Sequence, residues 1–324
     1  MMALQVRDRK STNPGAGGVS PHASPHLADE LIRLVSLGTI VRRDEPLAKK
    51  TTLRVGGPAD IYVEPCNESD VAAIFKFCSR RKLPFFILGR GSNLLVRDAG
   101  FRGVVISLSQ PFFSRIERTG EKFMCGAGAR LKILATEARR ANITGFEFLE
   151  GIPGTVGGAL RMNAGAMAGQ TFDIVESVRM MDFRGRICEK TPGELNVAYR
   201  HCSDLRSHAA LTAVLHGRPG SKESIESLMN QFSRKRWSSQ PAAPSAGCIF
   251  KNPATIPAGK LIEELGLKGT RSGGAVVSQE HGNFIITEAG ATARDVLELI
   301  SQIQTRAREK RGIDLQTEVE IIGH

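Results

Sequence analysis

Several features that mark particular classes of protein are scarce or absent in this sequence. With one Trp and two Tyr among 324 residues, it lacks the aromatic side chains of a nucleic-acid stacking platform. No apolar run approaches the roughly 18 residues of a membrane span. The N-terminus also lacks the apolar core of a secretory signal. We therefore expect a cytoplasmic protein with neither a membrane partner nor a nucleic-acid partner.

Cysteine pairing is absent as well. The six cysteines form no CxxC pair and show no zinc-ligand spacing; they are Cys66, Cys78, Cys125, Cys188, Cys202 and Cys248. In a cytosolic chain, cysteines of this kind are reduced thiols that are mostly buried and inert. We expect this of five of them, and we expect no metal site. Cys248 differs because it stands in a motif described below.

Positive charge is in excess, with 44 Lys and Arg against 33 Asp and Glu and a formal net charge of +11. The basic residues occur in short scattered groups without interleaved aromatics, such as Arg80-Arg81-Lys82, Arg139-Arg140 and Arg234-Lys235-Arg236. This distribution does not favour nucleic acid. A positive field also raises the local concentration of small anions near a cleft. Phosphorylated small molecules are therefore the expected substrates and cofactors.

Composition and periodicity divide the chain into three parts. Residues 1–28 are rich in Gly, Pro, Ser and His without an apolar period, which predicts a disordered tail. Residues 29–220 and 221–324 mix helical and strand patterns, which predicts α+β domains. Strands are expected at 59–64, 85–88, 104–108, 175–182, 211–215 and 313–322, and helices at 31–37, 70–82, 131–141, 221–235 and 293–310.

Cap residues define the ends of two of these helices. Ser69 is a candidate N-cap for the helix at 70–82, because its hydroxyl can accept a hydrogen bond from the first turn. Thr292 is the corresponding candidate for the helix at 293–310. Gly312 is the expected stop of that last helix, since glycine readily adopts the left-handed conformation of a C-terminal cap.

Glycine is concentrated in three loops, at residues 88–95, 125–129 and 151–166. Glycines let main-chain N–H groups converge on an anion such as a diphosphate, because no side chain blocks access. No GxGxxG occurs in a strand–turn–helix setting, which argues against a Rossmann site. The run at 254–260 lacks the first glycine of a Walker loop. From the residues alone, the loops fit diphosphate binding and plain tight turns equally well.

A series of short motifs lies at residues 52–60, 89–96, 151–159, 163–165, 199–200, 245–253, 258–262, 273–275, 281–284 and 315–323. The motifs and their order resemble those of one family, the UDP-N-acetylenolpyruvoylglucosamine reductases. The likeness runs from about residue 46 to the C-terminus. The chain looks like the shorter subgroup, because the segment between Arg200 and Lys235 leaves no room for the tyrosine-bearing substrate loop of the other subgroup.

The resemblance implies an α+β fold of the vanillyl-alcohol-oxidase type (PCMH-like), with FAD between two subdomains split near residue 109. It also implies NADPH as the reductant and a C-terminal substrate-binding domain. The residues implied to bind the cofactor are Arg54, Gly89, Arg90, Gly91, Ser92, Asn93, Gly126, Gly151, Gly154, Thr155, Gly157, Gly158, Asn163 and Gly165. Those implied to bind the substrate, a UDP-sugar enolpyruvyl ether, are Tyr199, Gln240, Lys251, Asn252 and Gly274. We expect a monomer.

The implied reaction converts UDP-N-acetylglucosamine enolpyruvate to UDP-N-acetylmuramate in peptidoglycan precursor synthesis. Hydride reaches the terminal methylene, so negative charge develops toward the carboxylate and the adjacent carbon takes a proton. By motif, Arg200 would stabilise this enolate and Glu318 would help to orient or polarise it. Cys248 stands where the family usually has serine, and would donate the proton, since a thiol is the stronger acid.

Two other functions fit parts of the sequence. A flavin oxidase of the same superfamily often tethers FAD covalently through a histidine, yet none of the seven histidines lies in the loop at 89–98. A nucleotide-binding regulatory module without chemistry would be expected to lose Arg200, Cys248 and Glu318 together. Each of these positions instead holds a chemically able residue. The sequence therefore favours the reductase.

Overall fold

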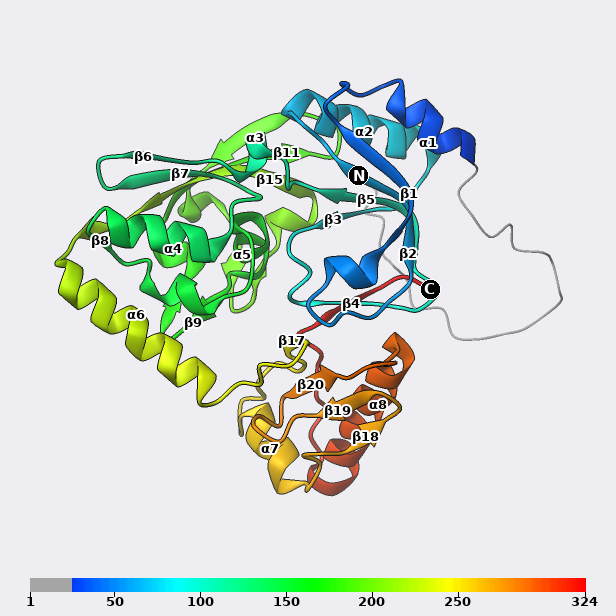
Figure 1. Ribbon diagram of the computed structural model, residues 1–324, viewed down its shortest axis with the longest axis vertical. Coiled ribbons are helices and arrows are strands. Elements are labelled where there is room, and N and C mark those ends of the chain that lie inside the picture. The colour runs from blue at the N-terminus through cyan, green and yellow to red at the C-terminus, as the bar shows by residue number, and fades with distance from the viewer. Residues whose placement is uncertain (1–24) are drawn as a thin grey trace, which may run out of the picture.

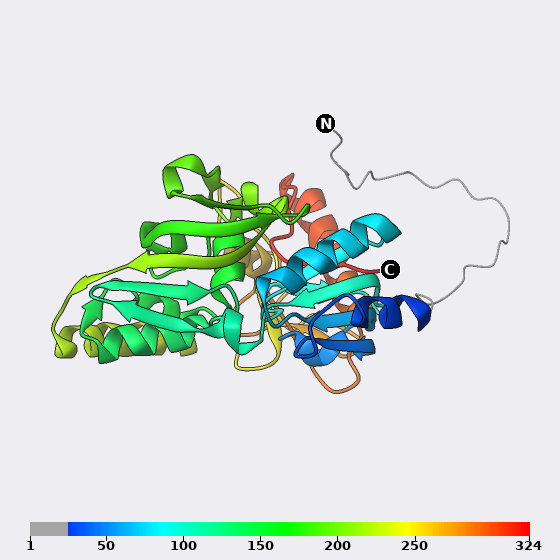
Figure 2. The same ribbon diagram turned by 90° about the horizontal axis from the view of Figure 1, so that it is seen from above.

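The structure, a computed structural model, describes residues 25–324. Three groups of helices and strands follow one another along the chain, and the last segment returns to the first group (Figures 1 and 2). Most of the tail predicted at 1–28 lies outside the described residues, but residues 25–28 belong to the first helix. No helix within the described residues combines the length and apolar character needed to cross a bilayer.

The first group is a mixed four-stranded sheet in the order β1-β2-β5-β3, in which β1 is antiparallel to β2 and the other pairs are parallel. Side chains of β2 alternate between two apolar clusters: Ile61 and Val63 pack with α1 and α2, and Tyr62 packs on the other face with Leu47 and Leu94. The sheet is therefore covered on both faces. Its elements are α1 Pro25–Ile32, β1 Ile40–Pro46, η1 Leu47–Lys50, β2 Pro58–Glu64, α2 Glu68–Arg81, β3 Phe85–Leu88, β4 Leu94–Val96 and β5 Phe101–Ser107.

The second group is an antiparallel five-stranded sheet in the order β12-β11-β15-β7-β6. Helices α4, α5 and α6 lie together beside this sheet (Figure 1). The helices of this group are α3 Pro111–Ser114, α4 Leu131–Arg140, η2 Glu147–Gly151, α5 Val156–Met162, η3 Thr171–Asp173, η4 Pro192–Glu194, η5 Asp204–Arg206 and α6 Lys222–Trp237. Its strands are β6 Ile116–Thr119, β7 Lys122–Gly126, β8 Ile143–Thr144, β9 Gly165–Ala166, β10 Gly169–Gln170, β11 Val175–Asp182, β12 Ile187–Lys190, β13 Val197–Ala198, β14 His201–Cys202, β15 His208–His216 and β16 Arg218–Pro219.

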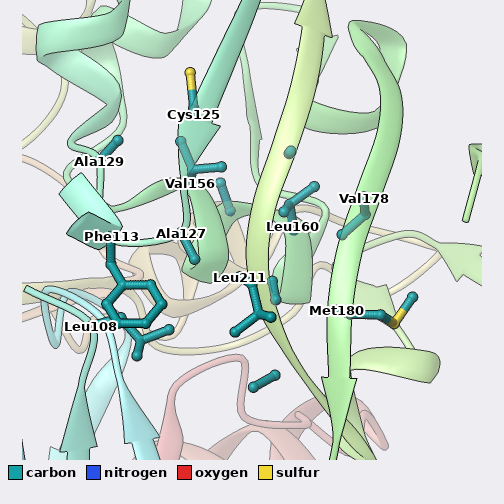
Figure 3. Packing of buried hydrophobic residues seen from close by; sticks show 14 of the residues in the cluster. Leu108, Phe113, Cys125, Ala127, Ala129, Val156, Leu160, Val178, Met180 and Leu211 are labelled. Atoms are coloured by element: carbon teal, nitrogen blue, oxygen red, sulfur yellow. The ribbon is translucent and has the colours of Figure 1, made fainter. Parts of the chain in front are cut away.

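The core of the second group joins its sheet to α5. Leu211 of β15 and Val178 and Met180 of β11 lie in the same cluster as Val156 and Leu160 of α5 (Figure 3). All five side chains are nearly inaccessible to solvent. Burying an aliphatic side chain of this size contributes about 1.5–3 kcal/mol. This packing fixes α5, and with it the third glycine loop, which leads directly into that helix.

The third group is an antiparallel sheet in the order β17-β20-β19-β18, with α7 and α8 packed against it. Its core is shared with Leu53, Val55 and Leu95 from the N-terminal part of the chain. The closing strand β21 leaves this group and pairs in parallel with β4, so the chain ends beside the first sheet (Figure 1). The elements are β17 Ser245–Cys248, α7 Ala258–Glu264, β18 Arg271–Ser272, β19 Ala275–Val277, β20 Phe284–Thr287, α8 Ala293–Arg311 and β21 Glu320–Ile322.

The helix predicted at 293–310 and both of its caps are confirmed. Thr292 and Asp295 form a capping box, and Gly312 caps the C-terminus at a φ of 64°. The helix predicted at 31–37 is wrong: α1 covers Pro25–Ile32 and buries Leu31, whereas the later leucines are exposed. Ala28 and Leu31 both belong to the buried core, so the helix lies earlier in the sequence than predicted.

Two further expectations need correction. Helix α2 is capped by Asn67, whose side chain accepts from the N–H of Asp70, and Ser69 lies exposed inside the first turn. The continuous strand predicted at 313–322 is also wrong, because only Glu320–Ile322 pairs regularly. The residues before it bond irregularly to the segment at 249–251, so they are extended without forming a ladder.

Replacing Asn67 by alanine is expected to lower the free energy of unfolding by about 1–2 kcal/mol, since the first turn of α2 loses its cap. The variant also loses the bond from the Asn67 amide to Ser36 Oγ. Chemical denaturation measures the change. Ser69→Ala is the matched control and should stay within about 0.5 kcal/mol of the parent protein. The opposite ranking of the two variants would refute the assignment of the cap.

Candidate active site

Arg200 lies in the two-residue turn between β13 and β14, where Ala198 pairs with His201. Its φ of 56° is in the left-handed region, which is uncommon for a residue other than glycine. Such a backbone persists only where its surroundings hold it. Here the guanidinium Nη2 donates to the carbonyl of Gly165 at 3.2 Å and the guanidinium carbon lies 5.0 Å from the ring centre of Tyr199, which is 56% exposed. The turn thus presents a fixed cation.

Glu318 forms an ion pair with Arg200, with 3.0 Å between Nε and Oε1, although 118 residues separate them along the chain. Only 22% of the Arg200 side chain and 15% of the Glu318 side chain are exposed. Burial raises the pKa of Glu318 above its usual value, while Arg200 and Lys251 act in the opposite direction. Within the described residues, Nη1 of Arg200 has no hydrogen-bond partner, so the guanidinium can still bind a ligand carboxylate.

Cys248 ends strand β17 and follows a glycine that faces open space. The preceding Gly247 has a φ of 76°, and a Cβ added to it would meet no atom within 4 Å. Burial raises the pKa of the Cys248 thiol to about 11, and the charge of Glu318 acts in the same direction. Arg200 and a hydrogen bond from Asn283 act the other way. The thiol is therefore protonated at neutral pH and lies within the electrostatic reach of the ion pair.

Positive charge gathers around His201. Burial lowers the pKa of this histidine, and the charges of Arg206, Lys251 and Arg161 act in the same direction. The imidazole is therefore neutral at pH 7, and the surrounding cations supply the positive field. Such a field attracts an anionic ligand to the site. Lys251, predicted to bind the substrate, is part of this group.

Two glycine loops face one another at the cradle that the sequence predicts. A Cβ added to Gly89 would lie 2.9 Å from Thr155 Oγ1, so at this residue the loop at 89–93 meets a side chain of the loop at 151–158. Gly89 itself is exposed. Because glycine has no side chain, the main chain at this contact stays accessible to an anion. The arrangement fits the diphosphate of FAD.

The remaining predicted cofactor residues fall into two groups. Those held in close packing or by hydrogen bonds within the protein, which would explain the residue without a ligand, are Gly91, Asn93, Gly126, Gly157, Gly158, Asn163 and Gly165. Those that stay exposed or half-buried are Arg54, Arg90, Ser92, Gly151 and Gly154. The second group is the one that a bound cofactor can reach.

The predicted substrate residues of the third group also differ in their surroundings. Asn252 Oδ1 accepts from the N–H of Ala258 at 3.0 Å, so only its amide N–H groups remain for a ligand. Gln240 is half-buried just after the end of α6. Gly274 is explained by packing, because a Cβ there would lie 2.6 Å from Ala291 Cα.

Sequence reasoning missed two residues of the site. The side chain of Asn283 makes two hydrogen bonds to the main chain of Phe250: it donates to the carbonyl at 2.8 Å and accepts from the N–H at 2.9 Å. It also bonds to the Cys248 thiol. Arg161 pairs with Glu320 at 2.7 Å. Both residues lie in or beside motifs of the resemblance, which was the available signal. Among residues 25–324, no cluster of His, Cys, Asp and Glu could hold a metal ion.

Comparison with known proteins agrees with this geometry. Residues 59–190 match the family described as "FAD binding domain". Residues 240–322 match the family described as "UDP-N-acetylenolpyruvoylglucosamine reductase, C-terminal domain". These matches define an FAD-dependent oxidoreductase, and the predicted α+β fold of the vanillyl-alcohol-oxidase type (PCMH-like) is confirmed.

Full-length relatives specify the family. A UDP-N-acetylenolpyruvoylglucosamine reductase of Clostridium botulinum (strain Alaska E43 / Type E3) is 41% identical over 88% of this chain and 94% of its own length. One of Heliobacterium modesticaldum is 43% identical over 87% and 90%. The crystal structure of the enzyme from Thermus caldophilus superposes with a TM-score of 0.77 at 37% identity, covering 88% of this chain and 100% of that one. The chain belongs to the UDP-N-acetylenolpyruvoylglucosamine reductase family.

Removing either member of the ion pair should change the rate at which Cys248 is alkylated, and the two removals should change it in opposite directions. Glu318→Gln removes a charge that raises the thiol pKa, so more thiolate forms and iodoacetamide should react several-fold faster at pH 8. Arg200→Met removes a charge that lowers this pKa, so the reaction should slow. In the parent protein the rate should rise with pH toward about 11. Peptide mass spectrometry follows the site, and equal rates in both variants would contradict the assignment.

Proposed function

We propose that this protein reduces UDP-N-acetylglucosamine enolpyruvate to UDP-N-acetylmuramate, with NADPH as the electron donor and FAD as the carrier. The net reaction adds one hydride and one proton across the carbon–carbon double bond and releases NADP⁺. The observation that carries the proposal is the grouping of a protonated thiol with the ion pair of Arg200 and Glu318, next to Gly247, which faces open space. Membership of the reductase family supports the same conclusion.

The cofactor would be held by the two facing glycine loops, at 89–93 and 151–158. When bound there, FAD supplies hydride for the terminal methylene of the enolpyruvyl group. The loops contribute main-chain donors to its diphosphate, and the exposed Arg54 and Arg90 contribute charge. We propose a cofactor domain at 29–220, split near residue 109, and a substrate domain at 221–324.

Arg200, oriented by Glu318, would stabilise the negative charge that develops on the substrate. The guanidinium stays positively charged and has N–H groups available for the substrate carboxylate, so it would stabilise the enolate electrostatically. Glu318 holds Nε of that guanidinium at 3.0 Å and so fixes its direction. Preorganised charge of this kind costs no reorganisation at the moment of reaction.

Cys248 would give the proton to the carbon that bears the carboxylate. Because burial and Glu318 hold its pKa near 11, the thiol carries a proton throughout the neutral range. The S–H bond breaks as the new C–H bond forms, and the thiolate left behind lies near the Arg200 charge until solvent reprotonates it. Lys251 and the amide of Asn252 would bind the UDP portion. We propose that the protein acts in the cytoplasm as a monomer, in peptidoglycan precursor synthesis.

An anaerobic experiment tests the substrate class. The purified yellow protein should lose its flavin absorbance on addition of NADPH, and UDP-N-acetylglucosamine enolpyruvate should restore that absorbance promptly. UDP-N-acetylglucosamine, which lacks the enolpyruvyl group, is the control and should have no effect. If the enolpyruvyl sugar failed to restore the absorbance, the proposed function would be wrong.

Cys248→Ala should slow the second half-reaction by about 10²–10⁴-fold, the usual contribution of a positioned acid, and leave reduction by NADPH nearly unchanged. Cys248→Ser should recover much of the rate, since a hydroxyl can replace the donor. Cys188, another half-buried cysteine, provides the control variant Cys188→Ala. Stopped-flow absorbance separates the two half-reactions. Normal turnover by Cys248→Ala would rule out the proton-donor role.

A further inference from the structure

Asn93 connects the glycine loop at 89–93, here called the cofactor loop, to the segment that carries Glu318. Its amide Nδ2 donates to the main-chain carbonyl of Glu318 at 3.0 Å, across 225 positions of the sequence. Its own carbonyl accepts from the N–H of Glu320 at 3.1 Å. Strand β21 then runs parallel to β4, with Glu320 paired with Leu94 (Figure 1). The side chain and the main chain of Asn93 therefore both engage the returning segment.

The same segment is held from the other side by the strand that carries the thiol. The N–H of Glu318 donates to the carbonyl of Ile249 at 2.8 Å, and that of Val319 to the same carbonyl at 3.3 Å. Ile249 directly follows Cys248. Both main-chain polar groups of Glu318 are thus committed, one to the cofactor loop and one to the strand of the proton donor. The carboxylate leaves this fixed point toward Arg200.

We infer that Asn93 is a positioning residue for Glu318, through which the cofactor loop sets the place of the catalytic carboxylate. The sequence motif predicts a cofactor ligand at this position, but the amide nitrogen is directed to the Glu318 carbonyl and, at 3.9 Å, to the sulfur of Met162. The carbonyls of Gly91 and Asn93 are bonded to Thr52 and Glu320, so the main-chain N–H groups of the loop are the ones that would bind FAD. The inference rests on the proposed function, because it assigns a partner to the carboxylate of that reaction.

A small displacement is enough to matter. Catalytic groups are effective when held within about 0.5 Å of the productive geometry, and a misplacement of ~1 Å can reduce a rate by about 10²-fold. Without the Asn93 amide, the Glu318 carbonyl loses its bond to the first glycine loop, and the main chain of Glu318 itself stays bonded only to Ile249 of the third group. The pairing of β21 with β4, which remains, begins two residues later. Arg200, which belongs to the second group, would then face a carboxylate that is no longer fixed relative to the cofactor.

Asn93→Leu removes the donor at nearly constant shape, and Asn93→Ala is the second variant in case the leucine is not accommodated. The holoenzymes should bind FAD within about twofold of the parent dissociation constant and react normally with NADPH. At saturating enolpyruvyl substrate, the single-turnover rate of the second half-reaction should fall by about 10–100-fold, with an unchanged half-saturation concentration. Alkylation of Cys248 at pH 8 should accelerate, as in Glu318→Gln, because the Glu318 charge is displaced.

Gln304→Ala is the matched control. Gln304 Nε2 donates to the carbonyl of Leu315 at 2.9 Å, a bond of the same type on the same returning segment, but within the third group. This variant should keep the second half-reaction within about threefold. If both Asn93 variants lost FAD in proportion to their loss of activity, Asn93 would be a cofactor ligand and the inference would be wrong. The inference would also be wrong if the rate of the second half-reaction were unchanged in these variants. A parent protein inert to the enolpyruvyl sugar would instead refute the proposed function, and the alkylation result would still decide the role of Asn93.

Discussion

The ion pair between Arg200 and Glu318 is the interaction on which the site depends. One partner sits in a tight turn of the second group, and the other on a segment that returns from the third group to the first. Breaking such a pair leaves one charge buried and uncompensated, which is far more destabilising than the pair itself is stabilising. The three groups of the fold must therefore be in place together before the charges can balance. The pair therefore forms only in the correctly assembled fold, in addition to its proposed role in catalysis.

The elements that the sequence predicted well are those governed by local periodicity and caps. The strand at 175–182 and the last helix, from Thr292 to Gly312, have their expected bounds within a residue or so, because their patterns are set by neighbours in sequence. The strand predicted at 313–322 failed for the opposite reason. Its alternation is real, but the partners of residues 316–319 are the distant residues 249–251, and that irregular pairing leaves no trace in the local pattern.

The candidate site was predictable only in part. Nothing in the local sequence marks Arg200, Cys248 or Glu318 as a functional residue. They were identified as candidates only by their places in the ordered family motifs. Glycine loops were ambiguous because one property, the absent side chain, permits both anion access and close packing. The structure separates these uses: Gly89 meets the opposite loop in an exposed position, whereas Gly126 lies against Phe113 inside the fold. Asn283 stands within one of the family motifs, but its bonds to Phe250 and Cys248 are tertiary contacts that leave no sign in the local sequence.

The burial of Cys248 bears on how long the protein survives in an oxidising cell. Hydrogen peroxide attacks the thiolate and hardly reacts with the thiol. Burial and a neighbouring carboxylate keep the proton on this sulfur, so they also limit the amount of the thiolate that peroxide would convert to sulfenic acid. In its proposed role as proton donor, Cys248 would therefore be a stronger acid than a serine hydroxyl without the usual sensitivity of an active-site sulfur to oxidative damage.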